Sequence, residues 1–147
     1  MTTTKRSFLA AALIAVCADL ATKLLAVSTL SDTSIDFGFM DLRLVHNEGV
    51  SFGLATALPW WVLVLLTSVV VITLGIAVWR GAIPAGIPAG LVVGGATANV
   101  IDRLIGGSVI DMLDLGWWPA FNAADVFIVL GVATLLLEGT RQKPAPR

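Results

Sequence analysis

Asp125 is a carboxylate just inside a segment that otherwise has the composition of a membrane-spanning helix, "FNAADVFIVLGVATLLLEG" at 121–139. A charged side chain in hydrocarbon costs a few kcal/mol or more, so such residues are rare and usually functional. Zinc chemistry is not favoured, because the chain has one cysteine, one histidine and no HExxH motif. We therefore expect neither a metal nor another cofactor at this carboxylate.

Other costly polar residues gather at a similar depth. They share faces of apolar segments at helical spacings, or lie in the connection before Asp125, and are Asp19 with Lys23, Asn99 with Asp102 and Arg103, Asn122 with Asp125, and Asp111 with Asp114. Each has a structural alternative: an internal ion pair for Asp19 and Lys23, snorkelling for Arg103, and interhelical hydrogen bonds for the two asparagines. Helix packing alone does not require charges confined to one depth, so the whole set favours a functional site.

The composition places these residues in a membrane protein. The 147 residues are 57% hydrophobic and 13% charged, with a mean hydropathy of +0.93, whereas a soluble domain carries about 25% charged residues. The net charge of −1 offers no basic surface for nucleic acid.

Four segments have about the length and apolarity needed to cross a bilayer, and they lie at about 7–30, 59–79, 87–104 and 121–138. The first resembles a secretory signal peptide, because Lys5 and Arg6 precede "SFLAAALIAVC". Its apolar run continues to Leu30, which is too long for a signal peptide and favours a retained helix. We therefore expect one membrane domain over 1–147.

The basic residues predict the orientation of these four segments. With the N-terminus inside, Lys5, Arg6, Arg80, Arg141, Lys143 and Arg147 are cytoplasmic, only Arg43 and Arg103 lie outside, and Lys23 is within the first segment. Both termini are then cytoplasmic, and the polar layer lies near the outer face. Trp60, Trp61, Trp117 and Trp118 form an aromatic belt at the outer interface.

The outer segment 31–58 has a different pattern. "IDFGF" and "DLRLV" each alternate apolar and polar residues, with a change of phase at Phe39 and Met40, which predicts two short strands or one bulged strand. The expected fold is therefore an all-α membrane protein of four transmembrane helices, with a small β-sheet on the outer membrane surface.

Four blocks of the sequence resemble the bacterial lipoprotein signal peptidases, or signal peptidase II. In family order they are "DLATK" (19–23), "NEGVSFG" (47–53), "GGATANVIDR" (94–103) with "VIDM" (109–112), and "PAFNAADVFIVLG" (119–131). Met112 stands where the family usually has Phe, Val50 and Ser51 replace a commoner small pair, and the linker from Asp111 to Asn122 looks shorter than in many relatives. No polar motif residue is missing.

The resemblance implies an intramembrane aspartyl protease that cuts prolipoproteins just before a diacylglyceryl-modified cysteine. It implies Asp111 and Asp125 as the catalytic pair, supported by Asp19, Lys23, Asn47, Gly49, Asn99, Asp102, Arg103 and Asn122. Two close carboxylates share one proton, so that one activates water and the other polarises the scissile carbonyl. The family also implies membrane lipid and globomycin-type peptides as partners, and a monomer in the bacterial inner membrane.

Three other functions remain open from the residues alone. A proton or ion carrier would also use buried Asp, Lys and Arg residues, but a relay should continue across the membrane, and the inner halves of the four segments carry no ionisable chain of residues. A membrane scaffold is disfavoured by the polar layer. A serine protease using Ser108 and His46 lacks the GxSxG surroundings.

Overall fold

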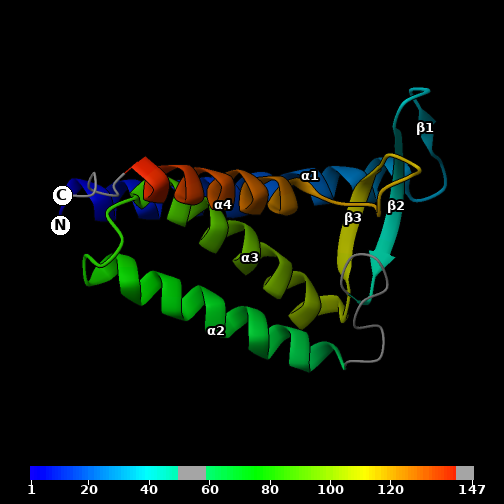
Figure 1. Ribbon diagram of the computed structural model, residues 1–147. Helices are drawn as coiled ribbons and strands as arrows, with labels where there is room; N and C mark the ends of the chain where they lie inside the picture. Colours follow the sequence, from blue (N-terminus) through cyan, green and yellow to red (C-terminus); the bar gives the residue numbers. More distant parts are fainter. Residues whose placement is uncertain (50–58, 142–147) are drawn as a thin grey trace.

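Four helices run side by side and a small sheet closes one end of the bundle (Figure 1). The computed structural model describes residues 1–49 and 59–141. The elements, in chain order, are α1 (Thr3–Leu30), β1 (Ile35–Asp36), β2 (Asp41–Asn47), α2 (Trp60–Trp79), α3 (Gly86–Gly106), β3 (Val109–Asp114) and α4 (Ala123–Arg141). Helix α1 begins and α4 ends at the end opposite the sheet.

Three of the four helices are long and apolar enough to cross a membrane: α1, α2 and α4. Their outward side chains are large and apolar; in α1, for example, Leu13 and Leu24 are 65% and 72% exposed, as expected of surfaces that face lipid. The crossing predicted at 87–104 corresponds to α3, which is not among these three. Helix α3 packs against α1, α2 and α4. It therefore needs small residues at these contacts rather than large apolar side chains that face lipid. A fourth transmembrane helix stays a prediction.

Helices α1 and α3 approach closely because α3 has glycines on the face toward α1. A Cβ atom on Gly90 would clash with the carbonyl oxygen of Phe8, and one on Gly94 would lie 2.8 Å from both the Cα of Ala12 and the Cβ of Ala15. Small residues let membrane helices pack backbone against backbone. This contact fixes the depth of the polar residues on α1 relative to those on α3.

The sheet has the order β1-β2-β3, and both pairs of strands are antiparallel. Strands β1 and β2 confirm the two-strand alternative for the described part of 31–58, with the turn between them where the phase changes; residues 50–58 lie outside the described residues. Strand β3 was not predicted; it forms at Val109–Asp114, in the connection between the third and fourth predicted segments. Buried and less buried residues do not alternate along β3, because Asp111 and Asp114 are buried as well as Val109 and Met112. The sequence therefore lacks the alternation of apolar and polar residues that predicts a strand.

Strand β3 is attached to two helices of the bundle, by packing against α1 and by a short connection from the end of α3. Met112 packs with Ala26 and Leu30 near the end of α1, so a methionine fills this apolar position well. Gly107, with φ of 73°, ends α3 and donates its N–H to the carbonyl of Arg103. A left-handed residue after a helix is most easily a glycine, and here it turns the chain directly into β3.

Candidate active site

Asp125 occupies the first turn of α4 and forms a reciprocal cap with Asn122. The Asp125 N–H donates to Asn122 Oδ1 at 3.0 Å, and the Asn122 N–H donates to Asp125 Oδ2 at 3.2 Å. Such a capping box satisfies backbone donors at a helix N-terminus, where a negative charge is also favourable. The local sequence thus holds this carboxylate in the first turn of α4, a helix long and apolar enough to cross a membrane.

Asp111 comes from β3 and faces the same asparagine. Its Oδ1 accepts from Asn122 Nδ2 at 2.8 Å, and its Oδ2 accepts from Asn47 Nδ2, on β2, at 2.9 Å. The side chain is buried, at 1% exposure, and this burial raises the pKa of Asp111 to about 6, with the negative charge of Asp125 acting in the same direction. The two asparagine donors and the charge of Lys23 oppose that rise in pKa.

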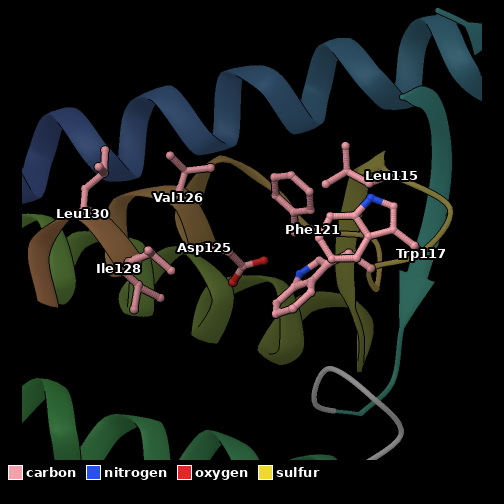
Figure 2. Close-up of a pocket in the computed structure, with 9 residues that line it drawn as sticks. Leu115, Trp117, Phe121, Asp125, Val126, Ile128 and Leu130 are labelled. Carbon is pink, nitrogen blue, oxygen red and sulfur yellow. The ribbon is translucent and has the colours of Figure 1, made fainter. Parts of the chain in front are cut away.

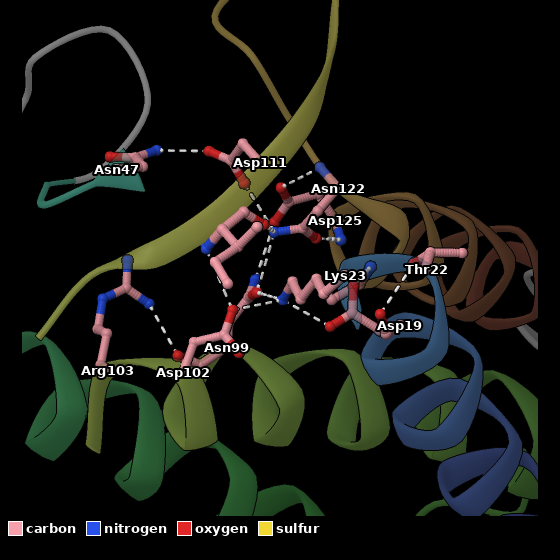
Figure 3. A network of polar contacts seen from close by, with 12 residues as sticks. Asp19, Thr22, Lys23, Asn47, Asn99, Asp102, Arg103, Asp111, Asn122 and Asp125 are labelled. Carbon is pink, nitrogen blue, oxygen red and sulfur yellow. Dashed lines mark hydrogen bonds and ion pairs between the residues drawn. The ribbon is translucent and has the colours of Figure 1, made fainter. Parts of the chain in front are cut away.

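Asn99, on α3, connects the pair to the interior of the bundle (Figure 3). Its Nδ2 donates to Asp125 Oδ1 at 3.0 Å, and its Oδ1 accepts from Asn122 Nδ2 and from Lys23 Nζ, each at 3.1 Å. One amide therefore joins three helices at a single depth.

The ammonium group of Lys23 contacts Asn99 and lies between two carboxylates. Its Nζ is 2.5 Å from Asp19 Oδ2 and 2.7 Å from Asp102 Oδ2, and the three side chains are between 0% and 8% exposed. The internal ion pair between Asp19 and Lys23 is thus present, but it is part of a triad that includes α3.

Arg103 closes the network on the other side. Its Nη2 donates to the Gly49 carbonyl at 2.9 Å, and its Nη1 lies 3.4 Å from the Asn99 carbonyl. The Gly49 N–H in turn donates to Asn47 Oδ1 at 3.1 Å, and this places Gly49 beside the asparagine that contacts Asp111. Arg103 therefore reaches toward the sheet and binds the backbone of Gly49, just after the end of β2.

The structure brings all ten predicted site residues into one connected network. The members are Asp19, Lys23, Asn47, Gly49, Asn99, Asp102, Arg103, Asp111, Asn122 and Asp125. Asp114 has different partners: its Oδ2 is 2.5 Å from Arg43 Nε, and its Oδ1 accepts from the Gly116 N–H. These two contacts, the Gly116 bond first, lower the pKa of Asp114.

A cavity of about 560 Å³ opens beside Asp125 and is almost entirely apolar (Figure 2). Trp117, Phe121 and Val129 are among the residues that line it, and the carboxyl of Asp125 is its charged group. The sequence predicted the tryptophans as an interfacial belt and gave no role to Phe121. The local signal was weak, because apolar residues next to a membrane helix are ordinary.

A second cavity, of about 380 Å³, lies on the side of α1, and His46, Ser108, Lys23 and Asp102 are among the residues that line it. Asp125 does not line it. The serine and the histidine are thus set apart from the carboxylate pair.

Comparisons with known proteins identify the family. Residues 11–141 match the model of the family described as signal peptidase (SPase) II. The chain is 39% identical over 136 residues to the lipoprotein signal peptidase of Aquifex aeolicus, covering 86% of this chain and 81% of that one. It is 38% identical over 117 residues to that of Vibrio campbellii, covering 73% of this chain and 70% of the relative.

The fold also has a solved counterpart. A bacterial membrane enzyme determined by the in meso method at 2.3 Å resolution superposes with a TM-score of 0.78 at 24% identity, over 95% of this chain and 93% of that chain. The family match covers the sheet, helices α2, α3 and α4, helix α1 from residue 11 onward, and all ten network residues, and it does not favour the carrier alternative. The chain therefore belongs to the signal peptidase II family, a family of bacterial membrane peptidases.

Proposed function

We propose that this protein is an aspartic endopeptidase that removes the signal peptide from prolipoproteins, cutting on the N-terminal side of the diacylglyceryl-modified cysteine, with Asp111 and Asp125 as its catalytic pair. The observation that carries the proposal is the position of Asn122. Its side-chain amide donates to Asp111 Oδ1, and its backbone N–H donates to Asp125 Oδ2. One residue thus holds both carboxyls toward each other.

The surroundings give the two carboxyls different roles. Asp111 is buried, and its pKa is raised to about 6, so it is the member that retains the shared proton. Asp125 is partly exposed to the apolar cavity, where it can take a proton from a water molecule. Asp111 then donates its proton to the scissile carbonyl oxygen as the water attacks. An apolar substrate that displaces water raises the pKa of Asp111 further and keeps this proton in place.

The cavity supports a lipid-modified substrate. Its lining from Trp117, Phe121 and Val129 is apolar and lies against the first turns of α4, and Trp117 is 76% exposed. An acyl chain on the cysteine would anchor the substrate in the outer leaflet and bring the neighbouring peptide bond to the depth of Asp125. Globomycin-type peptides would compete for the same place.

The orientation follows from the same arrangement. The charged layer and the sheet lie at one end, and α1 begins and α4 ends at the other, where the basic residues Lys5, Arg6 and Arg80 also lie. In the bacterial inner membrane the positive-inside rule then puts both termini in the cytoplasm and the catalytic pair near the outer face. One chain supplies every residue of the network, so a monomer suffices for the reaction.

Four variants test the pair on one lipidated precursor. Asp111→Asn and Asp125→Asn should each lower kcat by about 10³-fold or more, and the double variant should be little worse than either single variant, because the two residues act as a unit. Asp114→Asn is the matched control on the same strand, since its partners are Arg43 and Gly116, and it should retain most activity.

The thermal unfolding midpoint of each variant shows whether it is folded, which matters most for Asp125 because it also caps α4. An inactive but folded Asp114→Asn together with an active Asp111→Asn would refute the proposed pair.

A further inference from the structure

The triad of Asp19, Lys23 and Asp102 lies away from the cavity beside Asp125, because none of its members is among the residues that line that cavity. Asp19 is fully buried, and the side chains of Lys23 and Asp102 are 3% and 8% exposed. Buried ion pairs often add little net stability, because the desolvation of the charges offsets their attraction. Neither substrate contact nor fold stability therefore accounts for this arrangement.

Each carboxylate of the triad holds a backbone N–H that lies one residue before a member of the catalytic pair. Asp19 Oδ1 accepts from the Ala124 N–H at 2.8 Å, and Ala124 precedes Asp125. Asp102 Oδ2 accepts from the Ile110 N–H at 3.2 Å, and Ile110 precedes Asp111. The same relation thus occurs twice, once on α4 and once on β3.

Lys23 joins these two anchors. Its Nζ contacts Asp19 Oδ2 and Asp102 Oδ2 and also donates to Asn99 Oδ1. Without this cation, two buried carboxylates would repel each other across the space that it occupies. Figure 3 shows the lysine reaching from α1 into the centre of the network.

We propose that Asp19, Lys23 and Asp102 form a positioning clamp that sets the separation of the catalytic carboxyls through the backbone of Ala124 and Ile110. The inference rests on the proposed function, since it takes Asp111 and Asp125 as the pair. A displacement of about 1 Å at a reacting group can cost on the order of 100-fold in rate, so the clamp acts on kcat. It leaves KM nearly unchanged, because none of its members lines the cavity beside Asp125, where the substrate is proposed to bind.

The sharpest test replaces Asp19 in two ways. Asp19→Asn keeps an oxygen that can accept from the Ala124 N–H, whereas Asp19→Leu has a similar size and no acceptor. Asp19→Asn should remain within about 10-fold of the parent in kcat, and Asp19→Leu should fall by about 100-fold, with KM for a lipidated precursor within about threefold in both. Thr22→Val is the matched control, because within residues 1–49 and 59–141 Thr22 Oγ1 bonds only to the Asp19 carbonyl in its own helix. This variant should leave kcat unchanged.

A second test addresses the lysine. Lys23→Met removes the cation and should lower kcat by about 100-fold. The triple variant Asp19→Asn, Lys23→Met, Asp102→Asn removes the repulsion and keeps both amide oxygens as acceptors, so it should recover at least about 10-fold over Lys23→Met. A role in stability alone would move the unfolding midpoint without this recovery in kcat.

Equal kcat values for folded Asp19→Asn and Asp19→Leu would overturn the clamp, and so would a loss that appears entirely in KM. If Asp19→Leu does not fold, Asp102→Asn against Asp102→Leu makes the same comparison at Ile110. Asp111→Asn is assayed in parallel. If it stays active, the proposed pair is wrong; if it is inactive while the Asp19 variants match, only the clamp is wrong.

Discussion

Asn47 is the residue through which the protonation of Asp111 can be changed without altering either carboxyl of the pair. Its Nδ2 donates to Asp111 Oδ2 at 2.9 Å, and this bond lowers the pKa of Asp111 against the larger effect of burial. Asn47→Ala removes the donor. Because the donor stabilises the ionised form, its loss raises the pKa of Asp111.

The size of this rise follows from the burial of Asp111, which is 1% exposed and therefore poorly screened by water. A hydrogen bond to a charged group contributes about 1.5 to 3 kcal/mol, and one pKa unit corresponds to about 1.4 kcal/mol. The pKa of Asp111 should therefore increase by about 1 to 2 units from its value of about 6.

The assay is the pH dependence of kcat/KM on a lipidated precursor, since this ratio reports the ionisations of the free enzyme. Asp111 must be protonated to act as the acid, so a higher pKa extends activity to higher pH, and the alkaline limb of the profile should move up by about 1 to 2 units. His46→Ala is the control, because this neighbour on β2 is exposed and pairs with Ile110, and its profile should match the parent. An alkaline limb that stays in place or moves to lower pH in folded Asn47→Ala would show that Asp111 is not the acid.

Other predictions concern stability, packing, orientation and substrate. The raised pKa of Asp111 means that its ionisation opposes folding as pH rises from about 4 to about 6, so Asp111→Asn should gain up to about 3 kcal/mol of unfolding free energy at pH 7 and nothing near pH 4; equal gains at both pH values would contradict the burial argument. Gly94→Ala should lose about 1 to 3 kcal/mol through overpacking against α1, whereas Gly106→Ala, whose Cβ meets no atom of the described residues within 4 Å, should be neutral in the same thermal unfolding experiment. In a background without the native cysteine, Asp36→Cys should react with an impermeant thiol reagent added outside and Ala82→Cys should not, and the reverse pattern would invert the proposed orientation. An unlipidated precursor should have a kcat/KM at least about 10-fold lower than the lipidated form, because the acyl anchor of the lipidated form supplies binding energy. Equal kcat/KM values would contradict the proposal that the acyl anchor brings the peptide bond to the depth of Asp125.

The residues of the network could be predicted because charged and polar side chains are energetically costly within apolar, membrane-spanning segments. Asp19 and Asp125 stand out in apolar runs, and the helical spacing of Asn99, Asp102 and Arg103 puts them on one face at a definite depth. Charge in hydrocarbon is a strong signal in a single sequence, and it needs no knowledge of the tertiary contacts. The helix bounds were likewise predicted to within a few residues, since apolar length decides them.

The parts that sequence reasoning missed depend on contacts between distant segments. Strand β3 exists because β2 pairs with it, Val45 opposite Asp111, and its own pattern does not alternate. The proposed clamp depends on the backbone N–H groups of Ile110 and Ala124, and a backbone donor leaves no trace in the residue types. Helix α3 is less apolar than the other helices because it packs against α1, α2 and α4. Its composition alone does not reveal this central position.

The confinement of the buried charges to one end of the bundle has a consequence for where the protons of the reaction come from. Residues 7–18, 86–98 and 126–137, and helix Trp60–Trp79, contain no Asp, Glu, Lys, Arg or His, so the helices offer no relay toward the end where α1 begins. The proposed catalytic pair would therefore exchange protons only with water on the side of the sheet. In the proposed orientation, a cell that holds its interior at constant pH would not shield this enzyme, and acidification of the surroundings would reach Asp111 directly.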